Sequence, residues 1–285
     1  MLWKNREQSS NVEDRRGMSS GGKLGVGGGI GGIIIALIYM FIGGGDMGQV
    51  IDSVQSASQN QTATEQYKPS AQEEELATFS KVVMKDLETV WSKLFTQDGK
   101  QYEYPKLVLF SGTVTSACGR AGSSTGPFYC TGDNKVYIDL SFFQELKAKF
   151  NAPGDFAMAY VLAHEVGHHV QNILGISQQV MRLRDQVSEK EYNQYMVRLE
   201  LQADYFAGVW AHYAEKMNIL EPGDIEEAMG AASAVGDDRL QKQYQGYVVP
   251  DSFTHGTSEQ RSRWFMKGFK SGDMNGGDTF NARSI

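Results

Sequence analysis

The sequence predicts an α+β domain, mostly helical with a small β-sheet, preceded by one transmembrane helix. Long segments with apolar residues at helical spacing predict the helices, and two short apolar runs, 106–110 and 134–140, predict the strands. A stretch of 19 residues without a charge, 24–42, predicts the membrane helix. With 285 residues, 41% of them hydrophobic, the chain can form one large domain with appended segments.

The apolar run at 24–42 predicts a membrane anchor, because a helix of this length spans roughly 30 Å of hydrocarbon. The first cation after the run is Lys68, and the cations before it are Lys4, Arg6, Arg15, Arg16 and Lys23. The positive-inside rule therefore places residues 1–23 in the cytoplasm and residues 43–285 outside it. A cleaved signal peptide is the alternative, but no small-x-small cleavage site follows the run directly.

The segments that flank the domain lack a hydrophobic pattern. Residues 43–70 are rich in Gly, Gln, Ser and Thr and predict a flexible linker. Residues 271–285 predict a disordered tail. The folded domain is therefore expected to span residues 71–270.

The two cysteines, Cys118 and Cys130, bracket the turn-rich stretch "CGRAGSSTGPFYC". A lone pair in a domain expected to face an oxidising compartment predicts a disulfide that closes a short loop. A zinc knuckle is the alternative, but it needs about four ligands and no His or further Cys lies nearby.

The net charge of −7 gives no electrostatic reason to expect a nucleic-acid partner, which would favour a basic patch.

Several elements can be placed within the domain. Ser70 and Glu73 form a capping box, which predicts that a helix begins there. Beyond the two strands, helices are expected from Ser141, over 154–174, 189–217 and 222–235, and after Thr257.

The stretch "AHEVGHHVQ", residues 163–171, contains an HExxH pattern. On a helix, His164 and His168 project from one face one turn apart, so both imidazoles can bind one metal ion. Glu165 lies about 100° round the helix, where it can reach a metal-activated water without being a ligand. A structural histidine pair is the alternative reading. Three of the five histidines fall within six residues on a helix that looks buried, where unpartnered histidines are costly.

A third ligand is expected from "ELQAD", which places Glu200 and Asp204 four residues apart on a later helix. They share a face with small apolar residues, so this face can pack closely against another helix. Glu200 is expected to bind the metal, and Asp204 to hydrogen-bond to a ligand histidine. A solvated acidic pair is the alternative. The nitrogen and oxygen ligand set favours Zn²⁺ as the cofactor.

The motifs "AHEVGHHVQ", "ELQAD" and "HGTSEQRSRWF" together resemble a family of bacterial, single-pass membrane proteins described as neutral zinc metallopeptidases. The HExxH and ExxAD pair is similar to that of the gluzincins, whose fold is zincin-like. The resemblance implies zinc ligands His164, His168 and Glu200, with Glu165 as catalytic base. Together with the charge pattern, it implies a protein of the bacterial inner membrane whose catalytic domain is periplasmic or extracellular.

Four further assignments concern residues other than these ligands and the base. His169 is expected to lie in the second shell of the site or at the surface. His255 either stabilises the oxyanion of a tetrahedral intermediate, as a catalytic residue, or packs in a loop. Arg261 is expected to support the terminal helix, and the strand at 134–140 is expected, by analogy, to be an edge strand that binds a peptide substrate.

The sequence thus predicts a membrane-anchored zinc metallopeptidase that hydrolyses a peptide or protein substrate with a zinc-activated water outside the cytoplasm. The alternative is a catalytically idle zinc-binding scaffold or interaction protein of the envelope. Three protein ligands favour the enzyme, since structural zinc sites usually have four.

Overall fold

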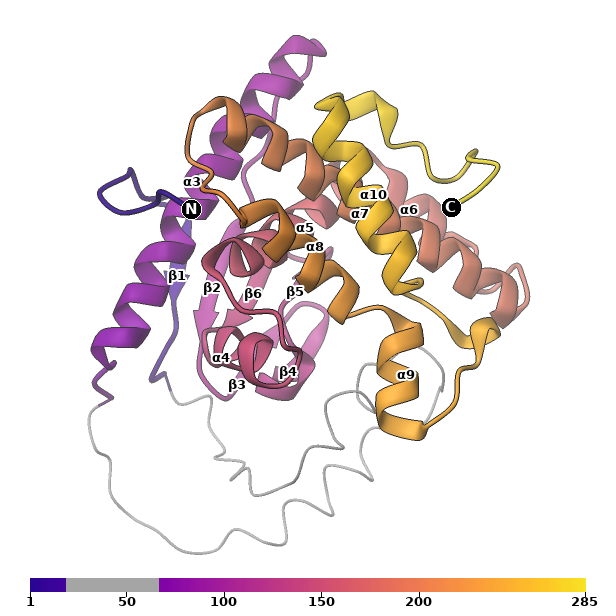
Figure 1. Ribbon diagram of the computed structural model, residues 1–285, viewed down its shortest axis with the longest axis horizontal. Helices are drawn as coiled ribbons and strands as arrows, with labels where there is room; N and C mark the ends of the chain where they lie inside the picture. Colours follow the sequence, from indigo (N-terminus) through magenta and orange to yellow (C-terminus); the bar gives the residue numbers. More distant parts are fainter. Residues whose placement is uncertain (19–66) are drawn as a thin grey trace, which may run out of the picture.

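The computed structural model describes residues 1–18 and 67–285, which form an α+β fold (Figure 1). The strands are β1 (Val12–Asp14), β2 (Lys106–Phe110), β3 (Thr113–Ser116), β4 (Gly119–Gly122), β5 (Phe128–Cys130) and β6 (Lys135–Asp139). The helices are α3 (Ala71–Gln97), α4 (Ser141–Ala148), α5 (Asp155–Ile173), α6 (Ile176–Arg182), α7 (Glu189–Lys216), α8 (Asp224–Ala234), α9 (Asp237–Gln245) and α10 (Ser258–Ser271). The predicted mostly helical fold with a small sheet is confirmed.

The main sheet has the strand order β1-β2-β6-β5. β1, β2 and β6 are parallel, and β5 runs antiparallel to β6. The chain turns between β5 and β6 at Asn134, whose φ of 57° suits a residue that tolerates the left-handed conformation. The expectation that the strand at 134–140 is an edge strand is therefore wrong, because β6 lies inside the sheet and β5 forms the edge.

The sheet is buried on both faces. Leu107 and Leu109 alternate with Val108 and Phe110 along β2, and all four are at most 1% exposed. The first pair faces the main core beneath α3 and α5, and the second packs with the β3–β4 hairpin. The predicted disulfide between Cys118 and Cys130 is present and ties this hairpin to β5.

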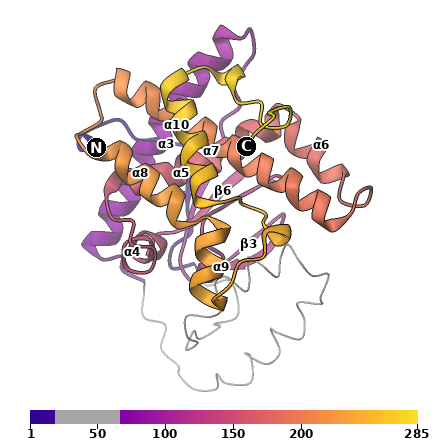
Figure 2. The same cartoon turned by 45° about the vertical axis from the view of Figure 1, so that its right-hand side comes forward.

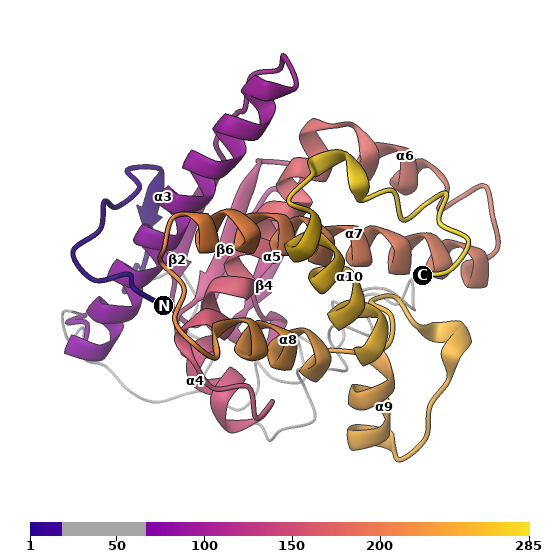
Figure 3. The ribbon, with the colours of Figure 1, turned by 45° about the horizontal axis from the view of Figure 1, so that its top comes forward.

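Helices α5 and α10 each pack against both α7 and α8 (Figures 2 and 3). The backbones of α7 and α10 meet at two glycines. A Cβ on Gly208 would lie 2.0 Å from the carbonyl oxygen of Phe265, and one on Gly268 would lie 2.0 Å from that of Tyr205. No side chain fits at either position, so both residues must be glycine for the two helices to approach this closely.

The first 18 residues are part of the same fold. β1 pairs with β2 over Val12↔Leu107 to Asp14↔Leu109. The α-ammonium of Met1 is buried and lies 2.5 Å from Asp155 Oδ1 at the start of α5. The predicted separate cytoplasmic segment at 1–23 therefore differs from the structure, in which residues 1–18 complete the sheet.

The membrane prediction is corrected. Within residues 1–18 and 67–285, no helix is both long enough and apolar enough to cross a membrane. The predicted anchor at 24–42 and nearly all of the predicted linker at 43–70 lie outside the described residues. The predicted single-pass topology is wrong for a structural reason as well. It places residues 1–23 across a membrane from the domain, whereas β1 pairs with β2 inside it. The predictions of a transmembrane helix and of an extracytoplasmic location are therefore both withdrawn.

Residues 272–285, here called the C-terminal segment, are also ordered. Thr279 is 0% exposed, and its hydroxyl donates to the carbonyl oxygen of Arg198 on α7. The guanidinium of Arg198 in turn donates to the carbonyls of Thr279, Phe280 and Ala282. The predicted disordered tail is wrong, because one α7 side chain binds several backbone carbonyls of a segment that lacks an apolar pattern.

Candidate metal centre

Helix α5 carries the HExxH residues. Its apolar N-terminal half is buried, and the helix is followed by Gly175 in the left-handed conformation, at a φ of 76°. His164 and Glu165 are 7% and 8% exposed, and His168 is half-buried. The rings of His164 and His168 lie with their centroids 4.7 Å apart, as expected for residues one turn apart on one face.

Helix α7 brings Glu200 to these two histidines. Glu200 Oε2 lies 3.2 Å from Nε2 of His164, and Oε1 lies 3.3 Å from Nε2 of His168. One donor atom from each of the three residues lies within 4.8 Å of the others. The structure thus brings together the three residues that the sequence predicts as metal ligands.

The contact between α5 and α7 depends on two small residues at the centre of the site. A Cβ on Gly167 would lie 2.9 Å from the carbonyl oxygen of Ala203. Gly167 lies between the two histidines, and Ala203 lies between Glu200 and Asp204. The close approach of the two backbones is what places the carboxylates against the imidazoles.

His164 is held by a buried network on the side away from Glu200. Its Nδ1 lies 2.9 Å from Oδ1 of Asp204, which is 0% exposed. Asp204 accepts two further hydrogen bonds from Arg261 on α10, at 2.8 and 3.0 Å, and one from the hydroxyl of Tyr160. The predicted hydrogen bond between Asp204 and a ligand histidine is therefore present. Because this hydrogen bond occupies Nδ1 of His164, Nε2 is the nitrogen that faces Glu200.

The electrostatics of this network favour positive charge at His164. Burial alone would lower the pKa of His164, but the carboxylates of Asp204 and Glu200 raise it to about 10. Burial alone would likewise raise the pKa of Asp204, but Arg261 and His164 hold it below its ordinary value.

The donor set fits a zinc ion. Tetrahedral zinc with bonds of about 2.0–2.1 Å requires neighbouring ligand atoms about 3.3 Å apart. The separations from the histidine Nε2 atoms to Glu200, 3.2 Å to Oε2 and 3.3 Å to Oε1, are of this size, each to a different carboxylate oxygen. Two imidazoles and one carboxylate are also a common ligand set of catalytic zinc, with the remaining position left to water. His164, His168 and Glu200 would hold the ion.

Glu165 lies beside the ligands without taking part in their network. Its side chain is 8% exposed, and its carboxylate makes no hydrogen bond or ion pair with any residue in 1–18 or 67–285. A carboxylate in this position is available for proton transfer, which is the role the sequence predicts for it.

His255 lies in the loop before α10. Asp237 at the start of α9 holds it: Oδ1 lies 3.1 Å from the His255 ring, and Oδ2 accepts from the backbone N–H groups of Thr254, His255 and Gly256. Burial alone would lower the pKa of His255, but Asp237, and after it Glu200, raise the pKa above its ordinary value. The loop before α10 is thus fixed by Asp237, and the charge of Glu200 acts on the imidazole that this loop carries.

His169 is on α5 beside His168, but its side chain lies on the sheet side of the helix and not with the metal ligands. Its Nε2 lies 2.6 Å from the carbonyl oxygen of Glu103, and its Nδ1 lies 3.0 Å from the hydroxyl of Tyr129 on β5. Burial lowers its pKa to about 4, so the ring is neutral and joins α5 to the sheet. None of its hydrogen bonds within the described chain reaches Glu165 or a metal ligand.

Three residues of the site were not identified as such from the sequence: Tyr160, Asp237 and Arg261. Tyr160 precedes His164 by one turn, so its place on the ligand face was a usable signal. Arg261 was expected to support the terminal helix, but it is 3% exposed and binds Asp204 in a bidentate manner. No local pattern marks Asp237, because its partner His255 is 18 residues away.

The chain is similar to a known protein family and to uncharacterized bacterial proteins. The chain matches the model of a family described as "Putative neutral zinc metallopeptidase" over residues 1–280. The uncharacterized protein YpfJ of Escherichia coli is 48% identical over 287 residues, covering 98% of this chain and 99% of the relative. The uncharacterized protein Rv2575 of Mycobacterium tuberculosis is 44% identical over 210 residues, covering 70% and 69%. No solved structure matches the chain significantly.

Proposed function

The chain belongs to the neutral zinc metallopeptidase family, and on that premise we propose that it is a zinc-dependent enzyme that hydrolyses peptide bonds. The observation that carries the proposal is the arrangement of His164, His168 and Glu200. They present three donor atoms within 4.8 Å of one another, and Glu165, which follows His164 on α5, keeps a free carboxylate.

A zinc ion held by these three residues would lower the pKa of a bound water to about 7 and so supply the nucleophile. Glu165 accepts the proton released during attack on the peptide carbonyl and then donates it to the leaving amine. His255, held by Asp237, donates to the oxyanion that develops on the substrate. Arg261 and Asp204 keep His164 in the orientation that turns its Nε2 towards Glu200.

The three-ligand set supports an enzyme over a zinc-binding scaffold. A structural zinc site usually has four protein ligands, and nothing in such a site calls for a free carboxylate beside the metal. The substrate is expected to be a peptide or protein, because the roles proposed for Glu165 and His255 act on the leaving amine and on the carbonyl oxygen of a peptide bond.

The test compares the full chain with its Glu165→Gln variant, which keeps the size of the side chain and removes the base. Zinc content and cleavage of a mixed peptide library are measured on the same samples. We expect one zinc per chain in both proteins and cleavage by the wild type only, with a loss of about 100-fold or more in the variant. Zinc in both proteins with cleavage by neither would favour the scaffold.

A further inference from the structure

The second histidine ligand, His168, is held by a different partner from that of His164. Its Nε2 faces Glu200 at 3.3 Å, and its Nδ1 lies 2.9 Å from the side-chain oxygen Oε1 of Gln171. A neutral imidazole carries one proton and offers one lone pair, so the partner of one nitrogen decides whether the other can bind a metal.

The carboxamide of Gln171 has only one favourable orientation. Its Nε2 lies 2.6 Å from the carbonyl oxygen of Leu199 and 3.1 Å from Oε1 of Gln202. A backbone carbonyl can only accept, so the NH₂ group must face Leu199 and the oxygen must face His168. The proton in this contact therefore belongs to Nδ1 of His168, which leaves Nε2, facing Glu200, as the nitrogen that can bind a metal.

Gln202 extends this arrangement to the end of the chain. It is 5% exposed, and its Nε2 donates to the carbonyl oxygen of Gly277, at 2.9 Å, in the C-terminal segment. This bond commits the NH₂ group of Gln202 and leaves its Oε1 to accept from Gln171. The carbonyl oxygens of Leu199 and Gly277 can only accept. They therefore fix which end of each glutamine carboxamide donates, from Gln202 through Gln171 to His168.

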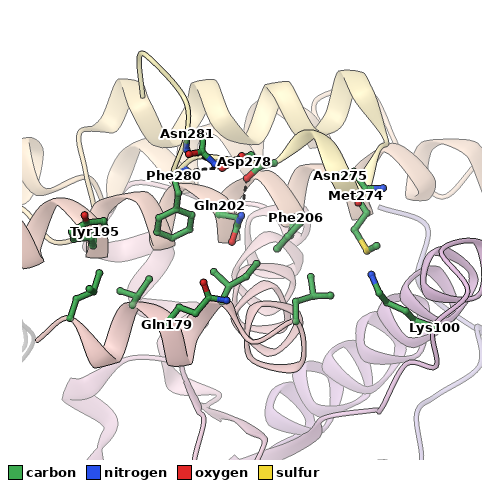
Figure 4. A pocket seen from close by; sticks show the side chains of 15 residues that line it. Lys100, Gln179, Tyr195, Gln202, Phe206, Met274, Asn275, Asp278, Phe280 and Asn281 are labelled. Atoms are coloured by element: carbon green, nitrogen blue, oxygen red, sulfur yellow. Dashed lines mark hydrogen bonds between the residues drawn. The ribbon is translucent and has the colours of Figure 1, made fainter.

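Gln202 also lines a cavity of about 530 Å³ (Figure 4). Its walls come from α6, from α7 and from the C-terminal segment, including Val180, Phe206 and Phe280. The cavity separates the C-terminal segment from α6 at this point. Gln202 on α7 is the residue whose hydrogen bonds connect this segment to Gln171.

We propose that Gln171 and Gln202 are positioning residues that fix Nε2 of His168 as the metal-binding nitrogen, with the C-terminal segment as their anchor. Neither glutamine touches the metal or the substrate: Gln171 acts through His168, and Gln202 acts through Gln171. The inference rests on the proposed zinc site and adds to it a requirement for residues 272–285. Partners of this kind typically change metal affinity by about 10- to 100-fold.

The experiment measures the zinc dissociation constant of the full chain by competition with a chromogenic chelator. Gln171→Met and Gln202→Met keep the side-chain length and remove the hydrogen bonds. We expect Gln171→Met to weaken zinc binding about 10- to 100-fold and Gln202→Met about 3- to 10-fold. The double variant should bind no more weakly than Gln171→Met alone, because both residues act through one contact.

The matched control is Gln241→Met. Gln241 is 6% exposed and also bridges two partners, Ser252 and the backbone of Val249, but none of its contacts leads to His168. Its loss is expected to lower the melting temperature without changing zinc affinity. A second readout is the Nδ1 proton of His168 in zinc-loaded, ¹⁵N-histidine-labelled protein. It should give a slowly exchanging signal in the wild type and lose it in Gln171→Met.

The outcomes are separable. If the wild type binds zinc and both glutamine variants bind it equally well, the inference is overturned while the proposed function stands. Additive losses in the double variant would overturn the link through Gln202. If the wild type binds no zinc, the proposed function fails and the inference fails with it. Should Gln171→Met not fold, the comparison of Gln202→Met with Gln241→Met decides.

Discussion

Replacing Gly167 with Ala tests whether the metal centre needs the direct contact between α5 and α7. The new Cβ would lie 2.9 Å from the carbonyl oxygen of Ala203, whereas ordinary contact begins at 3.4 Å. The two helices must therefore separate by about 0.5 Å, which typically costs about 1–3 kcal/mol. Better helix propensity offsets about 1 kcal/mol of this cost.

The same separation of α5 and α7 should weaken zinc binding. The distances of 3.2 and 3.3 Å from Glu200 to the histidines would grow by a similar amount, beyond the tolerance of about 0.2 Å for metal–ligand distances. We therefore expect Gly167→Ala to lower the unfolding free energy by about 0–2 kcal/mol and to weaken zinc binding about 10-fold or more. Urea unfolding in excess chelator and a zinc competition titration measure the two effects.

The matched control is Gly230→Ala on α8, where a Cβ would have no neighbour within 4 Å. This variant should be more stable than the wild type by about 0.5–1 kcal/mol, with unchanged zinc affinity. If Gly167→Ala is stabilised like the control and binds zinc as tightly as the wild type, the reasoning about the helix contact is refuted.

Three further predictions concern acid stability, the disulfide and the imidazole beside the site. A hydrogen bond from Lys135 lowers the pKa of Glu13 to about 2 from an ordinary 4.5, so its stabilising contribution is present above pH 4.5 and is lost as the pH falls towards 2. Glu13→Gln should flatten the fall in unfolding free energy over this range, and an unchanged pH profile would contradict this. Reducing the disulfide, which joins residues 12 apart in sequence, should lower the unfolding free energy by about 3 kcal/mol. Equal urea midpoints with and without reductant would argue against it. Asp237→Asn should release His255 and lower kcat by about 10- to 100-fold at unchanged zinc content, whereas loss of zinc would show that Asp237 supports the ligands instead.

The parts of the site that sequence could predict are those set by local helix geometry. The spacing of His164 and His168, and that of Glu200 and Asp204, places each pair on one face of its own helix whatever the rest of the fold does. The small residues around Glu200 indicated that this face meets another helix. The capping box at Ser70 and the strand at 106–110 were predictable for the same reason, since local spacing carries the signal.

The parts that sequence missed depend on pairing between distant residues. A buried Arg261 is tolerable only because Asp204, 57 residues away, neutralises it. β1 is a three-residue strand with two acidic residues, and its partner β2 lies more than 90 residues later, so neither length nor apolar pattern marks it. The same holds for the C-terminal segment, whose order comes from Arg198 and Gln202 on α7 rather than from its own composition.

The central claim is that one zinc ion binds between α5 and α7. X-ray absorption at the zinc edge of the zinc-loaded full chain tests it most directly. The account predicts a single four-coordinate zinc with two imidazole ligands and oxygen donors, all at about 2.0–2.1 Å. Glu200→Ala should lose an oxygen donor or the metal itself. A sulfur shell near 2.3 Å, six-coordinate zinc, or a spectrum unchanged by Glu200→Ala would contradict the assignment.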